Sequence, residues 1–465
     1  MRIGKGSSKL GAIGFGLGLF ALSMVSASPA YAKDVTIKIG VAMDQTGPLA
    51  SDGRKMVNAW RAYEDYVNNV KGGWKDVAGN NVKLQILHGD TGFTPQKSVA
   101  LYKKFKEDGA VVIVNAGSVE LAAIRNSLLE DKIPTPTNSG ALIYPLPSPA
   151  FSHWPDYSAV SASVIDYVKQ KWDQAQASSS SKRAPKIAFI GPEAYPSWEA
   201  AITPEVMRYA KLQGVEVVGK FFTALRTMDT KPQVLAAKNA GADFIYTGVV
   251  SSQGGAVIRD LYDLGLKGDP TKTPGKIEII GMFPLQSEQM IKLAGGRQDV
   301  VEGVLVIGSH AYVWEDKPAL RLVRKYAEKF GDMEGLDSSY VHEWLSAQYT
   351  DKAIEIALQK VPGDKLTGAH VMDAFLRVRN LDSGGIVPTP VSFSEENRVA
   401  LDKVRVERIQ DRKHVLVTYT DYKMLAPIYT EEYAKQRGKK SIYSDQTLTL
   451  LKLTAEQVGY QRIRE

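Results

Sequence analysis

Small polar residues and glycines directly follow several predicted strands, where such residues could bind a small molecule. Residues 44–48 (Asp-Gln-Thr-Gly-Pro) leave the first strand, and residues 51–53 (Ser-Asp-Gly) open the helix after it. Glycines let the backbone approach a ligand, and the free N–H groups at a helix N-terminus favour an anionic group. We therefore expect Gln45 and Thr46 to contact a ligand, with a plain turn and helix N-cap as the alternative.

Two more loops of the first half have the same small polar chemistry. Residues 115–118 (Asn-Ala-Gly-Ser) lie between a strand and a helix, so Ser118 could donate a hydrogen bond to a carboxylate or simply cap the helix. Asn138, Ser139 and Gly140 end a short proline-rich strand. These four residues are expected to bind a ligand.

Aromatic and apolar residues follow strands of the second half. Tyr195 comes after a strand, so its ring or hydroxyl could cover a bound molecule, with a surface aromatic as the alternative. Ser251 and Phe283 end or follow two later strands and offer mostly apolar surface. Trp154 and Trp344 lie where the chain is expected to border a cleft, although each alone is more often a packing residue. We expect these five residues to contact the ligand.

Motifs for catalysis or metal binding are missing from residues 33–465. There is no Gly-x-Ser-x-Gly nucleophile motif, no phosphate-binding loop, no His-Glu-x-x-His and no Gly-x-Gly-x-x-Gly after a strand. The six histidines are dispersed, and none has a second histidine at metal-ligand spacing. We therefore expect no catalytic residue, metal or cofactor, and predict that the protein is not an enzyme.

Short β-type runs alternate with helical runs along the chain, which is the pattern of parallel sheets covered by helices. Apolar residues alternate over 35–43, and the next run, 56–70, has them at three-to-four spacing. A second series of such units begins after the serine-rich residues 178–181. The pattern predicts an α/β protein with two lobes, in which the carboxyl ends of the strands face a shared cleft.

The elements expected in the second half include one long helix over 198–212 and three consecutive helices over 318–330, 338–360 and 367–377. The expected last strands are 387–393 and 415–419. Residues 33–465 form a chain longer than a single hydrophobic core usually supports, so its length also predicts two domains.

The N-terminus has the features of a secretory signal peptide over 1–32. Basic residues precede an apolar run over 10–25, and Ala30-Tyr31-Ala32 is a cleavage pattern. The run is shorter than a membrane-spanning helix needs. The absence of an Arg-Arg pair and of cysteine favours the Sec pathway and excludes a lipid anchor, so we expect a soluble periplasmic protein.

The charge is only mildly basic. Loss of the three basic residues of the signal lowers the formal net charge from +7 to +4, and the remaining Lys and Arg are scattered. Nucleic acid is therefore not an expected partner.

With these features in place, the chain resembles the type I periplasmic substrate-binding proteins of ABC transporters, in the branched-chain amino acid and amide branch that includes the Leu/Ile/Val-binding protein. The resemblance rests on residues 37–41 with 46–48, Gly117-Ser118, residues 138–141, 240–246 and 381–386. It implies a type I fold of two lobes, each a mainly parallel sheet flanked by helices, joined by a hinge of about three crossings. Lobe 1 would comprise 33–150 and 312–385, lobe 2 would comprise 151–311 and 386–425, and 426–465 would be a C-terminal extension packed on the body.

The resemblance also implies roles for the site residues. Ser118 and residues 138–141 match the positions that hold the ligand carboxylate, and Tyr195 matches the aromatic that closes over the ligand. Phe283 stands where amino-acid binders place an acidic residue against the ligand ammonium. Since a buried ammonium without a counter-charge costs several kcal/mol, this favours a carboxylate with an aromatic or aliphatic body.

The implied function is capture of a small carboxylate-bearing ligand by hinge closure and its delivery to the membrane permease subunits of an ABC importer, by a monomer. The alternatives are a branched-chain amino acid or amide binder, the ligand-binding subunit of a sensory system, and an exported enzyme on a two-lobed scaffold.

Overall fold

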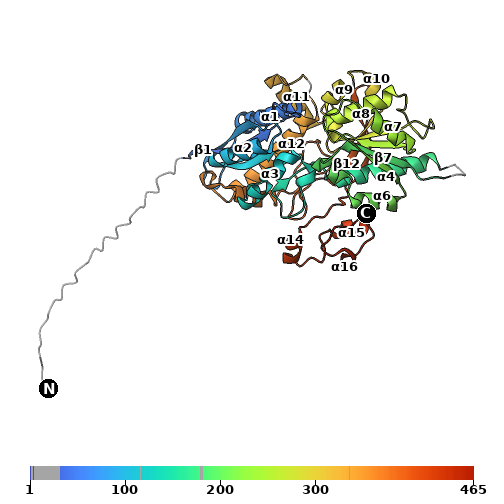
Figure 1. The fold of residues 1–465 in the computed structure, drawn as a ribbon. Coiled ribbons are helices and arrows are strands. Elements are labelled where there is room, and N and C mark those ends of the chain that lie inside the picture. Colours follow the sequence, from blue (N-terminus) through green and yellow to red (C-terminus); the bar gives the residue numbers. More distant parts are fainter. Residues whose placement is uncertain (2–3, 5–31, 116, 178–181, 335, 465) are drawn as a thin grey trace.

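The computed structural model describes residues 1, 4, 32–115, 117–177, 182–334 and 336–464, and its two α/β lobes lie side by side (Figure 1). Nearly all of the predicted signal peptide, 1–32, and the serine-rich residues 178–181 lie outside the described residues. In the described part of the chain, no helix is both long and apolar enough to cross a membrane.

Lobe 1 is built on a four-stranded sheet of order β2-β3-β1-β4. Strands β1 (Asp34–Met43), β3 (Asn81–Asp90) and β4 (Ala110–Asn115) are parallel, and the short β2 (Trp74–Lys75) is antiparallel to β3. The alternating apolar residues of β1 are buried, as their spacing predicts. The helices of this lobe are α1 (Ala50–Asp65), α2 (Pro95–Glu107), α3 (Ser118–Glu130), α11 (Pro318–Phe330), α12 (Ser338–Leu358) and α13 (Gly368–Phe375), with a π-helical turn η1 (Tyr66–Lys71) and a 3-10 turn η4 (Gly363–Lys365).

Lobe 2 is built on a seven-stranded sheet of order β13-β12-β11-β10-β9-β7-β8. The strands β7 to β11 are mutually parallel, and β12 and β13 complete the sheet in antiparallel pairing. Its strands are β7 (Lys186–Pro192), β8 (Glu216–Thr223), β9 (Phe244–Thr247), β10 (Glu278–Met282), β11 (Leu305–Gly308), β12 (Lys403–Gln410) and β13 (Lys413–Asp421). Its helices are α4 (Tyr157–Ala175), α5 (Pro196–Ala201), α6 (Pro204–Gln213), α7 (Lys231–Asn239), α8 (Ser251–Asp263), α9 (Glu288–Leu293) and α10 (Gln298–Val301), with a 3-10 turn η3 (Phe283–Gln286).

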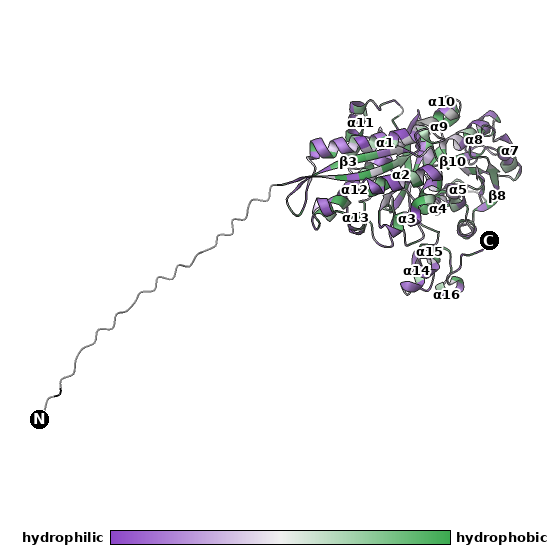
Figure 2. Ribbon diagram, turned by 60° about the vertical axis from the view of Figure 1, so that its left-hand side comes forward, coloured by the Kyte–Doolittle hydropathy of each residue, from purple (hydrophilic) through white to green (hydrophobic). Residues whose placement is uncertain are grey.

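Apolar residues gather in the sheets, and hydrophilic residues gather on the outer helix faces (Figure 2). This distribution is what the alternating and three-to-four spacings of the sequence predict. Each lobe has its own buried apolar cluster, and Leu49 and Val119 of lobe 1 also pack against the cluster of lobe 2.

Within the described residues that precede the C-terminal extension, the chain passes between the lobes three times. The first passage follows the small pair β5 (Thr135–Pro136) and β6 (Ala150–Phe151), the second follows β11, and the third precedes β12. Residues 386–401 pack in the lobe 1 core, where Ile386, Val391 and Phe393 are buried. Lobe 1 thus extends past 385, the end expected from the sequence, because these apolar residues cover α12 and α13.

The structure corrects two predicted elements and adds one strand that was not predicted. The helix expected over 198–212 is two helices, since Pro204 lacks an N–H and Thr203 caps a new helix by accepting from the Val206 N–H. The strand expected over 387–393 forms only an isolated bridge at Val391, because Pro388 and Pro390 lie within it and lack an N–H group for sheet pairing. Strand β12 was not expected, although its valines alternate in the usual way.

The C-terminal extension, 426–465, carries the short helices α14 (Glu431–Gln436), α15 (Asp445–Leu450) and α16 (Ala455–Val458). It packs on both lobes. The Leu146 N–H donates to the Ile428 carbonyl at 2.8 Å on the lobe 1 side, and Arg462 pairs with the buried Glu205 of α6 at 3.0 Å on the lobe 2 side.

Candidate ligand-binding site between the lobes

A cavity of about 100 Å³ lies between the two lobes, at the carboxyl ends of their strands. This is where the topology of open parallel sheets places ligand sites. Lobe 1 lines it with Met43, Asp44, Leu49, Asp52, Gly53, Met56, Gly117, Ser118, Glu120, Asn138, Ser338 and Ser339. Lobe 2 and the first passage line it with Trp154, Tyr157, Tyr195, Val249, Val250, Ser251, Phe283, Pro284 and Ser287.

Ser118 connects the two lobes across this cavity. It is the first residue of α3, and its Oγ lies 2.7 Å from Ser139 Oγ in lobe 1 and 2.6 Å from Ser197 Oγ on α5 in lobe 2. All three hydroxyls are buried. Because Ser197 belongs to the other lobe, this contact joins the two lobes.

Ser287 makes a second connection between the lobes. Its hydroxyl donates to Asp52 Oδ1 at 3.3 Å and to Asp337 Oδ2 at 3.2 Å, and both acceptors belong to lobe 1. Lys55 binds Asp337 at 2.6 Å. Burial and the neighbouring Asp337 raise the pKa of Asp52 to about 6.

The carboxyl group of Glu120 lies at the N-terminus of α3. A Cβ added to Gly117, the N-cap residue, would lie 1.5 Å from Glu120 Oε2, so the carboxyl covers the start of the helix. Glu120 is 2% exposed, and its Oε1 has no hydrogen-bond partner among the described residues. Burial raises the pKa of Glu120 to about 7, and the nearby carboxylates of Asp44 and Asp90 act in the same direction.

Asp44 also lines the cavity, but its carboxylate is engaged with the loop after β1. Its Oδ1 accepts from the Gly47 N–H at 2.5 Å and its Oδ2 accepts from the Leu49 N–H at 2.7 Å. This carboxylate therefore shapes the loop and leaves Asp52 and Glu120 as the acids that face the cavity.

Aromatic rings form the apolar wall. The rings of Trp154 and Phe283 meet edge to face, with centroids 3.8 Å apart, and Tyr157 lies 5.5 Å from Phe283. Tyr195, the N-cap residue of α5, closes the lobe 2 side, and burial raises its pKa to about 12. No Lys or Arg is among the residues that the structure places in the cavity lining.

Most of the predicted ligand-binding residues come together in this cavity. Ser118, Asn138, Trp154, Tyr195, Ser251 and Phe283 line it. Ser139 lies behind Ser118, and Gly140 lies against the first passage, where an added Cβ would come within 2.4 Å of the Pro155 carbonyl oxygen.

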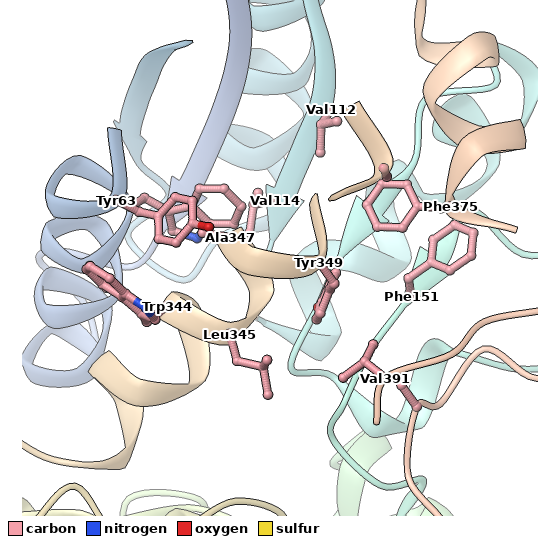
Figure 3. Packing of buried hydrophobic residues seen from close by; sticks show 14 of the residues in the cluster. Tyr63, Val112, Val114, Phe151, Trp344, Leu345, Ala347, Tyr349, Phe375 and Val391 are labelled. Atoms are coloured by element: carbon pink, nitrogen blue, oxygen red, sulfur yellow. The ribbon is translucent and has the colours of Figure 1, made fainter. Parts of the chain in front are cut away.

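Three predicted residues lie elsewhere. The Gln45 N–H donates to Asp90 Oδ1 at 2.8 Å and the Thr46 hydroxyl donates to Asp90 Oδ2 at 2.6 Å, so both residues fasten the loop to the end of β3 outside the cavity. Figure 3 shows Trp344 in the lobe 1 core beside Tyr63. Their ring centroids are 5.0 Å apart. Its position on α12 faces inward, contrary to the sequence prediction.

Sequence reasoning missed the two cavity acids. Glu120 stands three positions after the glycine of the Gly-Ser loop, where an acidic residue signals a helix N-terminus, and Asp52 lies in a turn already recognised as a helix start. Their presence corrects the argument made from Phe283. An ammonium group in this cavity would have carboxyl groups beside it.

Comparison with known proteins gives one family and many similar structures. The family model described as "Periplasmic binding protein" matches residues 36–414. A search of curated protein sequences found no match.

Among solved structures, a branched-chain amino acid ABC transporter protein from Thermus thermophilus with bound valine is 19% identical, with a TM-score of 0.70, over 88% of this chain and 99% of that one. A fatty acid ABC transporter substrate-binding protein from Thermomonospora curvata is 23% identical, with a TM-score of 0.68, over 83% and 92%. A solute-binding protein from R. palustris in complex with 4-hydroxybenzoate is 21% identical, with a TM-score of 0.65, over 83% and 98%. These likenesses confirm the predicted two-lobed α/β fold.

Proposed function

Because the chain belongs to the periplasmic binding protein family, we propose that it is the substrate-binding component of an ABC importer. It captures a small carboxylate-bearing ligand with an aromatic or aliphatic body between its lobes and delivers it to the membrane permease subunits. It acts in the periplasm as a monomer after export through the Sec pathway, carries no lipid anchor, and performs no chemistry on the ligand.

The observation that carries this proposal is the cavity between two lobes that contact each other through side chains. Ser118 with Ser197, and Ser287 with Asp52, are contacts across the cleft. A ligand that touches both lobes gains those contacts only in the closed form, so it shifts the equilibrium toward closure by the difference in its affinity for the two forms. A permease can then distinguish the loaded form by its shape.

The walls of the cavity support an acid with an apolar body. Ser118 and the first N–H groups of α3 are donors suited to a carboxylate, and the rings of Trp154 and Phe283 suit an apolar body. The similar structures named above include proteins of a fatty acid transporter and of a 4-hydroxybenzoate complex.

A second candidate ligand is a branched-chain amino acid. It is favoured by Glu120 and Asp52, which could pair with an ammonium group, and by the valine bound to the Thermus thermophilus protein. The two candidates differ in whether the cavity receives a positive charge.

A thermal-shift measurement with benzoate, octanoate, L-valine and L-leucine tests the proposal. A ligand present at about 100 times its dissociation constant adds about 2.7 kcal/mol to the free energy of unfolding, which is readily seen. We expect benzoate or octanoate to raise the melting temperature. A rise with L-valine or L-leucine alone would replace the first candidate by the second, and no rise with any of the four would contradict both.

A further inference from the structure

We propose that Glu120 takes up a proton when a carboxylate ligand binds, so that the ligand is held by a hydrogen bond from the protonated Glu120 carboxyl group. The ligand arrives ionised, one proton comes from solvent, and the complex keeps a single negative charge shared by the two carboxyl groups. This inference rests on the proposed function, because it requires a carboxylate in the cavity.

The geometry places the two carboxyl groups together. The Glu120 carboxyl covers the Gly117 end of α3, which is the end that attracts an anion, and Ser118 projects from the same turn. A ligand carboxylate bound by Ser118 and the N-terminal N–H groups therefore meets Glu120. Glu120 lines the cavity, and its buried Oε1 atom has no hydrogen-bond partner among the described residues, so a ligand carboxyl group can supply the missing partner.

Among the described residues, no lysine or arginine lines the cavity to neutralise a second negative charge there. Lys55 binds Asp337 at 2.6 Å, and Lys97 lies 3.7 Å from Asp90. Neither lysine lines the cavity. Two carboxylates in direct contact cannot both remain ionised, and one of them binds a proton.

The other groups around Glu120 act in the same direction. Asp44 after β1 and Asp90 at the end of β3 both favour the neutral form of Glu120, and the Thr91 hydroxyl partly opposes them. On the lobe 2 side, Tyr195 stays neutral at physiological pH, since burial raises its pKa to about 12. Asp52 on α1 is another acid that lines the same cavity, so it supplies no positive charge that would stabilise the ionised form of Glu120.

The expected effect follows from the pKa of Glu120, which is about 7 before the ligand binds. If only the protonated form binds a carboxylate, the association constant falls by about 30-fold between about pH 6 and about pH 8.5. An ammonium ligand has the opposite dependence, because it pairs with the ionised form.

The test is isothermal titration of the purified protein with benzoate and with octanoate at these two pH values, in wild type, Glu120→Gln and Asp52→Asn. The wild type should bind about 30-fold more weakly at the higher pH. Glu120→Gln should lose most of this dependence, since its amide donates without taking up a proton. Asp52 also ionises in this range, because its pKa is about 6, so Asp52→Asn should keep most of the dependence and not all of it.

Each contrary outcome has a distinct meaning. If benzoate or octanoate binds the wild type equally at both pH values, this inference is wrong and the proposed function stands. The same conclusion follows if Glu120→Gln keeps the full pH dependence of the wild type. Failure of both acids to bind at the lower pH, with L-valine binding more tightly at the higher pH, overturns the carboxylate ligand and this inference together. No binding by any of the three overturns both as well.

Discussion

The hydrogen bond between Ser118 and Ser197 should contribute directly to closure of the two lobes. Their Oγ atoms lie 2.6 Å apart in a buried position, and Ser118 also contacts Ser139 at 2.7 Å. The variant Ser197→Ala removes the contact between the lobes and leaves the contact within lobe 1. It should shift the equilibrium of the ligand-free protein toward the open form.

The size of the shift follows from the chemistry of the contact. A neutral intramolecular hydrogen bond contributes about 1 kcal/mol net, so its loss should lower the ratio of closed to open molecules about fivefold. The apparent affinity for ligand should fall by a similar factor, because only the closed form makes contacts from both lobes. Ser139→Ala is the matched control, since it deletes the other bond of Ser118 without touching the second lobe.

The chain has no cysteine, so a fluorophore pair can be attached at two introduced cysteines. Val70→Cys in lobe 1 and Met228→Cys in lobe 2 replace exposed side chains. Energy transfer between the labels then reports the open and closed populations with and without benzoate. An unchanged population in Ser197→Ala, or an equal opening in Ser139→Ala, would refute the assignment of this bond to closure.

Three further predictions concern the site and the lobe 1 core. Tyr195→Ala should weaken ligand binding roughly tenfold at an unchanged fold, measured by titration and circular dichroism, and undiminished affinity would remove Tyr195 from the site. Burial raises the pKa of Glu343 from 4.5 to about 8, so the wild type should lose free energy of unfolding as the pH rises from about 4.5 toward 8. Urea unfolding of Glu343→Gln should lack this loss, and an identical loss in the variant would contradict the assignment to Glu343. Burial lowers the pKa of His310 to about 4 and also lowers that of His342, so the free energy of unfolding should fall as the pH drops below about 6.5. In urea unfolding, His342→Gln should reduce this dependence of the free energy on pH. An unreduced dependence would show that His342 does not contribute.

Much of the fold could be predicted because it depends on local periodicity. Helix α11 begins and ends at the predicted residues, Pro318 and Phe330, since a proline at its start and a glycine after its end are local signals. The position of the strand-end loops that carry Ser118 and Phe283 could be predicted for a related reason. The alternation of strands and helices requires a parallel sheet, and a parallel sheet brings its loops to one edge.

Trp344 shows what periodicity could not decide. Helix α12 is buried on nearly every side, so its apolar pattern does not distinguish the face toward the core from a face toward the cleft. Only the packing of Tyr63 and Tyr326 around the ring assigns it to the core.

The sequence by itself determined the class of the protein and the local positions of its loops, because strand and helix periods, caps and turn residues act over a few neighbours. Only the tertiary structure decided that Glu120 and Asp52 line the cavity between the lobes. Their raised pKa values come from burial and from carboxylates distant in the sequence, such as Asp90 and Asp337. The burial and the electrostatic environment of a side chain depend on residues that are distant in the sequence and that folding brings together, so no local sequence pattern predicts them.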